Sequence, residues 1–308
     1  MFYMKKLKTF TGIACVLAML ITAQAQSFIT NGLVAYYPFN GNANDASGNG
    51  NNGTVNGATL TTNRFGNANS AYYFNGGTTS VSVLNSASLN LYQNLTVSVW
   101  VKTSSLNSGA ADPAALVARG GLYVANTQWM LRLNSNSNFT FWVGDGNSDA
   151  EYVTSGVYTK GYWESYAVTF NSTNKLISLF INGILDATYT SAYTAQSNSA
   201  IAFILGNQVD TQHAFTGSLD DVRIYNRALS TNELAQLFQI ESAPILNAFN
   251  AIGVATANLK VGTNYQFQVS SNLVNWINSG SVFTATNSSW TNYYPATSTS
   301  QFYRLLQH

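Results

Sequence analysis

Cysteine, charge and histidine are all scarce in this chain of 308 residues. Its single cysteine, Cys15, lies in an apolar N-terminal run, so the remainder of the chain can form no disulfide, cysteine nucleophile or cysteine-ligated metal site. Only 8% of the residues are charged and no basic stripe is present, which argues against nucleic acid as a partner. His213 is the only histidine away from the C-terminus, so neither a zinc site with two histidines nor a Ser-His-Asp triad has support.

Residues 1–25 have the pattern of a secretion signal. A start rich in lysine precedes an apolar run over residues 9–23, which is too short for a comfortable membrane span. Ala23-Gln24-Ala25 then gives a small-x-small cleavage pattern, so we expect an exported protein whose mature chain begins at Gln26. Acylation of Cys15 in a lipoprotein is the alternative, although the residues before this cysteine do not match that motif well.

Short strands of alternating character dominate the mature chain. Residues 95–101 place Leu and Val on one face and Thr, Ser and Trp100 on the other. The dipeptide Asn182-Gly183 lies between two such runs and predicts a tight hairpin. Further strands are expected at 129–133, 139–143, 176–181, 184–189, 201–206 and 215–225. Many short strands separated by Gly, Asn and Ser predict an all-β, antiparallel sandwich.

A short helix and a second module are expected after the sandwich. Ser230-Thr-Asn-Glu233 matches a capping box and predicts a helix that ends near Gln239. The stretch 241–244 is typical of a linker. A strand and a turn over 265–276 and later strands at 282–287 and 301–306 are too few for another large sandwich. We therefore expect one domain over residues 26–240 and a small β-module over residues 241–308.

Three segments in order resemble a known family. They are Gly32-Leu-Val-Ala-Tyr-Tyr-Pro-Phe-Asn-Gly41 with the Gly/Asn-rich loop after it, Thr96-Val-Ser-Val-Trp-Val-Lys102, and Gly217-Ser-Leu-Asp-Asp-Val-Arg-Ile-Tyr-Asn-Arg-Ala-Leu-Ser230. Together they resemble the LamG-like (concanavalin A-like) jellyroll family. The resemblance implies an antiparallel jellyroll that binds glycans, matrix or cell-surface partners rather than a catalyst.

The C-terminal segment has a looser resemblance of its own. Tyr265-Gln-Phe-Gln-Val-Ser-Ser-Asn-Leu-Val-Asn-Trp276 and the closing Phe302-Tyr-Arg-Leu305 resemble a small fibronectin-III-like module. In bacterial exported proteins such a module recurs at the ends of multidomain chains. The resemblance implies a spacer or an attachment element.

The jellyroll resemblance also implies a structural calcium site. Asp45 and Asp220 would bracket the ion, with Gly48 and Asn51 adding carbonyl or amide oxygens, because calcium takes six to eight oxygen ligands. Such an ion would tie the first strand region to the last in a chain that has no disulfide.

The same residues allow a second interpretation without a metal. Asp45 can form an Asx-turn, and Asp220 and Asp221 can pair with Arg223 or Arg227. Because Asp220 and Asp221 are adjacent in a strand, they point to opposite faces and at most one is expected to reach a shared ion. The two interpretations stay open from the sequence alone.

The acidic residues do not have the pattern of a glycosidase. Jellyroll glucanases place their carboxylates on one strand as Glu-x-Asp-x-x-Glu, and that spacing is absent here. The densest acidic group is Asp145, Asp149 and Glu151: residues 144–149 have the pattern of a loop, and Asp149 and Glu151 would share a face only if Ala150 lay in a strand. We expect no catalytic residue and no enzyme activity, with a divergent glycosidase as the least favoured alternative.

Four aromatic residues are candidates for carbohydrate binding, because sugars stack on aromatic rings. They are Trp100, Trp142, Tyr152 and Trp163. The competing interpretation is packing, since a large aromatic side chain in a two-sheet sandwich is more often in the core. The expected partner is a polysaccharide or glycoconjugate, and the alternative is an adhesive surface protein that binds protein partners.

Overall fold

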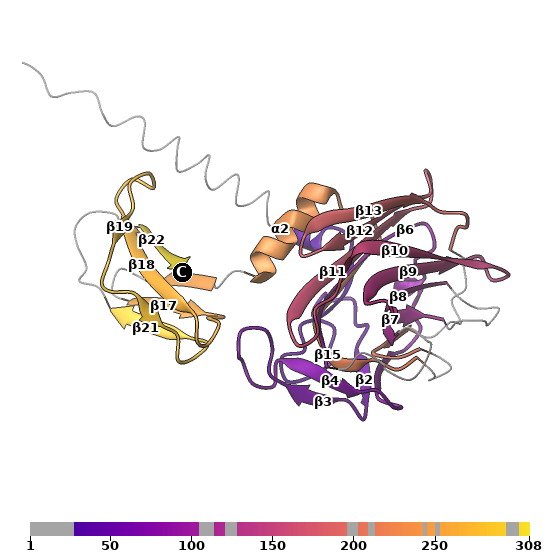
Figure 1. Ribbon diagram of the computed structural model, residues 1–308, viewed down its shortest axis with the longest axis horizontal. Helices are drawn as coiled ribbons and strands as arrows, with labels where there is room; N and C mark the ends of the chain where they lie inside the picture. The colour runs from indigo at the N-terminus through magenta and orange to yellow at the C-terminus, as the bar shows by residue number, and fades with distance from the viewer. Residues whose placement is uncertain are drawn as a thin grey trace, which may run out of the picture.

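The computed structural model describes residues 28–104, 114–120, 128–195, 203–208, 213–242, 245–249, 253–293 and 302–308. These residues form a large β-sandwich, a helix packed against it and a smaller β-module (Figure 1). The predicted signal sequence and its cysteine lie outside the described residues. Within these ranges, no helix is long and apolar enough to cross a membrane.

The first sheet of the sandwich has eight strands in the order β13-β12-β11-β6-β15-β4-β3, with β1 paired to β15. All its pairings are antiparallel. The strands are β1 (Leu33–Tyr37), β3 (Thr59–Thr61), β4 (Ala71–Asn75), β6 (Asn94–Thr103), β11 (Trp163–Asn171), β12 (Leu176–Ile181), β13 (Ile184–Thr190) and β15 (Thr216–Tyr225).

The second sheet has seven strands in the order β10-β9-β8-β7-β14-β5-β2. The strands are β2 (Gly53–Asn56), β5 (Ser80–Val83), β7 (Ala114–Arg119), β8 (Trp129–Leu133), β9 (Asn138–Gly144), β10 (Asp149–Val157) and β14 (Phe203–Leu205). A single 3-10 turn, η1 (Ala87–Leu89), precedes β6. The predicted all-β sandwich is therefore confirmed.

The core lies between the two sheets, and the alternation of β6 sets which side chains enter it. Leu95, Val97, Val99 and Val101 are buried in this core, as the sequence predicts. Trp100 instead belongs to the outer face of the eight-stranded sheet, where its ring stacks on Phe238 of the helix. The apolar surface that the strands remove from water is the main stabilising contribution here.

Local turn and helix signals are confirmed as well. Asn182 and Gly183 both have positive φ, 51° and 74°, as a type I′ hairpin between β12 and β13 requires. The helix α2 (Thr231–Ser242) begins with the expected capping box. The Glu233 amide donates to Ser230 Oγ at 3.3 Å, and the Ser230 amide donates to Glu233 Oε2 at 2.7 Å.

The end of α2 differs from the expectation. The helix continues to Ser242, so Glu241 is a buried helical residue and not the start of a linker. Its carboxylate accepts hydrogen bonds from Trp100 and Arg223 on the sheet, which holds the last turn against the sandwich. The apolar side of α2 packs on the same outer face through Leu234 and Leu237.

The C-terminal module contains two small sheets. One is formed by β16 (Ile245–Phe249), β17 (Gly253–Ala257) and β21 (Trp290–Tyr293). The other has β18 (Asn264–Ser270) at its centre, with β19 (Ile277–Asn278), β20 (Phe283–Thr284) and β22 (Phe302–Gln307). Leu259, Tyr265 and Ala285 form its core. Two stacked sheets are compatible with the expected small β-module, and its likeness to fibronectin III stays a prediction.

Candidate functional site

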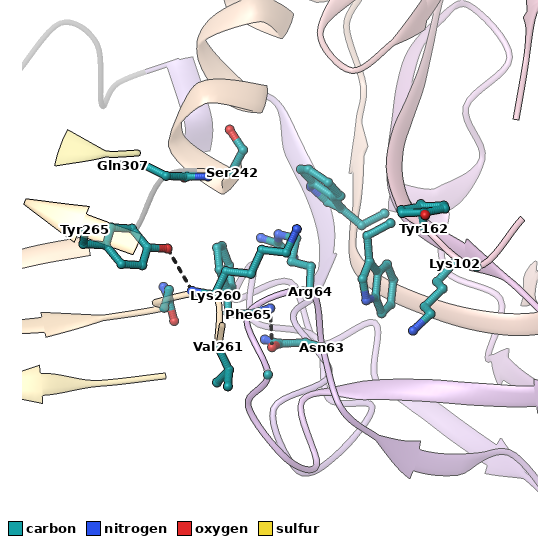
Figure 2. Close-up of a pocket in the computed structure, with 15 residues that line it drawn as sticks. Asn63, Arg64, Phe65, Lys102, Tyr162, Ser242, Lys260, Val261, Tyr265 and Gln307 are labelled. Atoms are coloured by element: carbon teal, nitrogen blue, oxygen red, sulfur yellow. Dashed lines mark hydrogen bonds between the residues drawn. The ribbon is translucent and has the colours of Figure 1, made fainter. Parts of the chain in front are cut away.

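An open pocket of about 680 Å³ lies between the outer face of the eight-stranded sheet and the C-terminal module (Figure 2). Its wall combines aromatic rings, neutral amides and basic side chains. The sandwich and α2 contribute Asn63, Arg64, Phe65, Gly66, Trp100, Lys102, Gly161, Tyr162, Trp163 and Ser242. The C-terminal module contributes Asn258, Lys260, Val261, Tyr265 and Gln307.

The register of β6 and β11 determines which sandwich side chains line this wall. Lys102 on β6 is the direct cross-strand partner of Trp163 on β11, so their side chains stand on the same face. Trp100 is two residues earlier on β6 and shares that face. Tyr162 lies in the turn just before β11, and 68% of its surface is exposed. An aromatic and basic strip thus borders the part of the sheet that α2 leaves uncovered.

Trp100 lines the pocket, and three neighbouring side chains fix its indole ring. Its indole Nε1 donates to Glu241 Oε2 at 2.8 Å, and its ring stacks on Phe238 with a centroid distance of 5.5 Å. The Arg64 guanidinium lies 4.5 Å from the ring centroid. With only 5% of its surface exposed, Trp100 offers little area to a ligand.

Arg64 reaches the Trp100 ring from the loop between β3 and β4. Its Nη1 is 2.5 Å from Asp220 Oδ2 and its Nη2 is 2.6 Å from Asp221 Oδ2. Its Nε also donates to the Glu241 backbone carbonyl at 2.9 Å. One guanidinium therefore links a loop, the closing strand β15 and the end of α2. Lysine, which has a single ammonium nitrogen, could not reproduce this planar arrangement of three donor nitrogens.

Arg223 extends the same buried network toward the first strand. Its Nε is 2.7 Å from Glu241 Oε1, and its guanidinium lies 3.6 Å from the ring centroid of Tyr36. The Tyr36 hydroxyl in turn donates to Asp221 Oδ1 at 2.5 Å. The resulting cluster contains three carboxylates and two guanidinium groups, contributed by β15, α2 and the loop of Arg64.

Burial changes how readily these carboxylates ionise. It raises the pKa of Asp220 well above its ordinary value, and the nearby charge of Asp221 raises it further, while Arg64 opposes both effects. Burial also raises the pKa of Glu241, against the opposing effect of Arg223. Burial is the main cause for both pKa shifts because it penalises the charged form, and the one carboxylate in excess of the guanidinium groups acts in the same direction.

The basic side chains at the rim differ from Arg64. Neither Lys102 nor Lys260 forms an ion pair within the described part of the chain, and no Asp or Glu belongs to the pocket wall. Lys260 is exposed, and its backbone amide donates to the Tyr265 hydroxyl at 3.0 Å. Two ammonium groups for which the described residues supply no ion-pair partner thus border the pocket.

The residues of the expected calcium site have other partners. Asp45 Oδ1 accepts from the Tyr36 and Ser47 amides at 2.9 and 2.8 Å, and Oδ2 accepts from the Asn51 amide and Ser47 Oγ at 3.0 and 2.9 Å. Four donors therefore surround this carboxylate, which is the pattern of an Asx-turn in a Gly-rich loop.

The other expected ligands do not join Asp45 at a common point. Asp220 is paired with Arg64, and the amide oxygen of Asn51 accepts from Ser86 Oγ at 2.6 Å. Gly48 lies in the exposed part of the loop, and among the described residues no group of three or more acidic, histidine or cysteine residues could hold a metal. The calcium site thus stays a prediction that these contacts do not support.

Arginine pairing also differs from what the sequence indicates. Asp220 and Asp221 both pair with Arg64, a residue that sequence reasoning missed, instead of Arg223 or Arg227. Arg227 pairs with Glu233 at 2.8 Å. The only sequence signal for Arg64 is its isolation among neutral residues, because its partners lie more than 150 positions away in the chain.

Two of the four predicted carbohydrate-binding residues lie in the pocket, and the other two lie elsewhere in the sandwich. Trp100 and Trp163 come together in the pocket. Tyr152 is buried in the sandwich core, where its hydroxyl donates to Ser191 Oγ at 3.2 Å. Trp142 lies on the outer face of the seven-stranded sheet, 5.5 Å from the Arg132 guanidinium. The structure therefore joins two of the four candidates and adds Tyr162, Lys102 and Lys260, which the sequence did not single out.

The acidic group that a divergent glycosidase would use lies apart from the pocket. Asp145 accepts two backbone hydrogen bonds, from Asn147 and Ser148, within an exposed turn. Asp149 and Glu151 belong to β10, on the other sheet. None of the three lines the pocket.

Comparisons with known proteins agree with this architecture. Residues 75–235, about half of the chain, match the family described as the concanavalin A-like lectin/glucanases superfamily. No curated protein sequence matches the chain.

Three solved structures illustrate the likeness of fold. The binding domain of Paraclostridial Mosquitocidal Protein 1 is 19% identical, with a TM-score of 0.58 over 77% of this chain and 58% of that one. The Botulinum neurotoxin serotype D ligand-binding domain, solved with N-acetylneuraminic acid, is 16% identical, with a TM-score of 0.57 over 80% and 58% of the chains. The Botulinum neurotoxin serotype G binding domain is 16% identical, with a TM-score of 0.55 over 76% and 56%. This chain thus spans less than two thirds of those structures.

Proposed function

This chain belongs to the concanavalin A-like lectin/glucanases superfamily, and from that premise we propose that it is an exported, non-catalytic module that binds a polysaccharide or glycoconjugate. The observation that carries the proposal is the pocket between the sandwich and the C-terminal module, whose wall holds Trp163, Tyr162 and several neutral amides. Export follows from the secretion-signal pattern of residues 1–25.

The chemistry of the wall suits a sugar. A pyranose ring presents apolar C–H faces and a rim of hydroxyls, so it needs a flat aromatic surface and neutral donors and acceptors. Trp163 and Tyr162 supply aromatic surface, and Asn63, Asn258 and Gln307 supply amides. Because these groups come from both modules, we propose that the C-terminal module is part of the binding site rather than a spacer alone.

The positions and partners of the carboxylates near the pocket favour a binding role over catalysis. Glycoside hydrolysis uses two carboxyl groups roughly 5–9.5 Å apart with access to the substrate. No Asp or Glu belongs to the wall, and the carboxylates behind Trp100 are engaged by Arg64 and Arg223. These groups stabilise the site and do not face a substrate.

Solved structures of similar fold support only part of this proposal. Two of them are binding domains, and one of these was solved with N-acetylneuraminic acid. At 16–19% identity the likeness is one of fold, and it covers 58% of those chains. The location of the sugar site on this chain therefore rests on the pocket and not on those ligands.

Adhesion to a protein partner is the second candidate, and one surface favours it. The edge strand β13 exposes Ile184, Leu185 and Tyr189. An apolar strand edge is a familiar place for another chain to bind. The pocket favours the glycan proposal because it combines aromatic and polar groups, which a purely apolar interface would not need.

A glycan array tests the proposal. We expect the full chain to bind one class of polysaccharide, and Trp163→Ala to weaken that binding about tenfold through loss of stacking. Tyr92→Ala is the matched control, because Tyr92 is an exposed aromatic residue outside the pocket. Absence of binding to every polysaccharide, or equal binding by the Trp163 variant, would contradict the proposal.

A further inference from the structure

We propose that the pocket selects an anionic polysaccharide, one that carries carboxylates or sulfate esters, and holds it between Lys102 of the sandwich and Lys260 of the C-terminal module. This inference rests on the proposed function and specifies its ligand class. It starts from the charge of the pocket wall, where three basic residues and no acidic residue are found.

Only two of those three basic residues are open to a ligand. The guanidinium of Arg64 is paired with Asp220 and Asp221, and its side chain has only 7% of its surface exposed. Lys102 and Lys260 have no acidic partner in the described part of the chain. The electrostatic attraction available to a ligand therefore comes from these two ammonium groups.

Lys102 is placed by the sheet. It is the last residue but one of β6, with Trp163 as its cross-strand partner on β11 and Ser218 as its partner on β15. Strands on both sides fix its backbone, and Trp163 projects from the neighbouring position on the same face. A sugar that stacks on this tryptophan would bring an equatorial substituent within reach of the ammonium group.

Lys260 approaches from the opposite wall. It follows Leu259, which is fully buried in the core of the C-terminal module, and its amide is bonded to the Tyr265 hydroxyl. Figure 2 shows its side chain extending from the C-terminal module toward the sandwich, on the side of Arg64. The two lysines therefore face one cavity from two modules.

Local charge is decisive because the chain as a whole has little. The formal net charge is +1 for the full chain and −2 without the three lysines of residues 1–25 (10 basic and 12 acidic residues), so the protein as a whole does not attract a polyanion. A recessed wall strengthens each ionic contact relative to open solvent. An anionic ligand would give both ammonium groups the counter-charge that the described residues do not supply, whereas a neutral sugar would form no ion pair with them.

The test compares polysaccharides that share a backbone and differ in charge. Polygalacturonate against its fully methyl-esterified form addresses carboxylates, and dextran sulfate against dextran addresses sulfate esters. Binding of the full chain is measured by isothermal titration at low and at physiological salt. We expect at least one anionic form to bind about tenfold or more tightly than its neutral counterpart, with affinity falling as salt increases.

Variants then locate the effect. Lys102→Gln and Lys260→Gln should each weaken binding of the anionic form about tenfold and leave binding of the neutral form unchanged. Lys175→Gln is the matched control, because Lys175 is an exposed lysine in the β11–β12 turn and does not line the pocket. An equal loss with the control variant would overturn the inference, since it would show attraction to charge in general.

Other outcomes separate this inference from the proposed function. Equal binding of charged and neutral forms, lost in Trp163→Ala but kept in both lysine variants, overturns the inference and leaves the proposed function standing. No binding of any polysaccharide overturns both. A single-stranded DNA that binds as tightly through the same two lysines overturns the polysaccharide class, because the site would then recognise charge without recognising sugar.

Discussion

Lys102 and Trp163 stand directly opposite each other on β6 and β11, on the face of the eight-stranded sheet that points away from the core. Part of this face is covered by α2, whose Phe238 stacks on the ring of Trp100. The Lys102–Trp163 pair lies beyond that cover and lines the pocket instead. One face of one sheet thus packs against a helix over part of its area and borders the proposed ligand pocket over another part.

Trp100 is predicted to stabilise the fold rather than to bind the ligand. Trp100→Phe keeps a ring against Phe238 but removes the donor to Glu241 Oε2. Leaving a buried carboxylate oxygen without this donor should lower the free energy of unfolding by about 1–3 kcal/mol. Urea denaturation measures the change, and Trp163→Phe is the control because Trp163 has no such bond among the described contacts. A Trp100→Phe variant with normal stability and no polysaccharide binding would reverse the assignment.

Asp220 is predicted to lower the free energy of unfolding as pH rises. Burial raises its pKa, so its contribution to stability is fully present below the ordinary value of about 3.8 and is lost as pH rises through the raised value. Asp220→Asn cannot ionise. The stability of this variant relative to the natural chain should therefore increase between about pH 4 and pH 8. Urea denaturation at both ends of this range checks the sign, and a constant difference would contradict it.

Asp45 is predicted to stabilise the fold through hydrogen bonds and not through a bound ion. Asp45→Asn replaces one carboxylate oxygen by an amide NH2 group, which then faces a backbone N–H and cannot accept its hydrogen bond. This change should cost about 1–3 kcal/mol of unfolding free energy. Because four donors surround the carboxylate, we expect EDTA to leave the thermal midpoint of the natural chain unchanged. A midpoint that falls with EDTA and recovers with added calcium would instead establish the calcium site that the family resemblance implies.

The end of α2 is predicted to set the boundary of the sandwich. A chain that stops after Ser242 keeps Glu241, whereas one that stops after Ile240 loses the partner of Arg223 and Trp100. Removing one member of a buried ion pair costs about 3–5 kcal/mol, so the shorter chain should unfold at a much lower urea concentration. Equal stability of the two truncated chains would place the boundary at 240, as the sequence alone suggested.

Much of the fold could be predicted because its signals are local. The alternation of β6, the Asn182-Gly183 turn and the Ser230–Glu233 capping box each depend on neighbouring residues, and each is confirmed. The helix end was missed because Glu241 breaks the apolar pattern. Its burial depends on Arg223 and Trp100, which lie 18 and 141 positions away in the sequence and which this pattern does not reveal.

The site was less predictable for a related physical reason. Alternation placed Trp100 on the outer face, but it could not show that α2 and Arg64 would cover the ring. Lys260 has no motif, and its role depends on how a second module faces the sheet. Pockets between modules are set by such packing, which a strand pattern does not encode.

The most direct measurement is an NMR titration of the full chain with an oligosaccharide of the best-bound polysaccharide. The indole resonances of the six tryptophans report separately on the pocket and on the other sheet. Our account predicts that the largest changes occur at the Trp163 indole and at the backbone amides of Lys102 and Lys260, with Trp142 unaffected. Largest changes at Trp142, and none at Trp163, would place the binding site on the seven-stranded sheet and contradict the account.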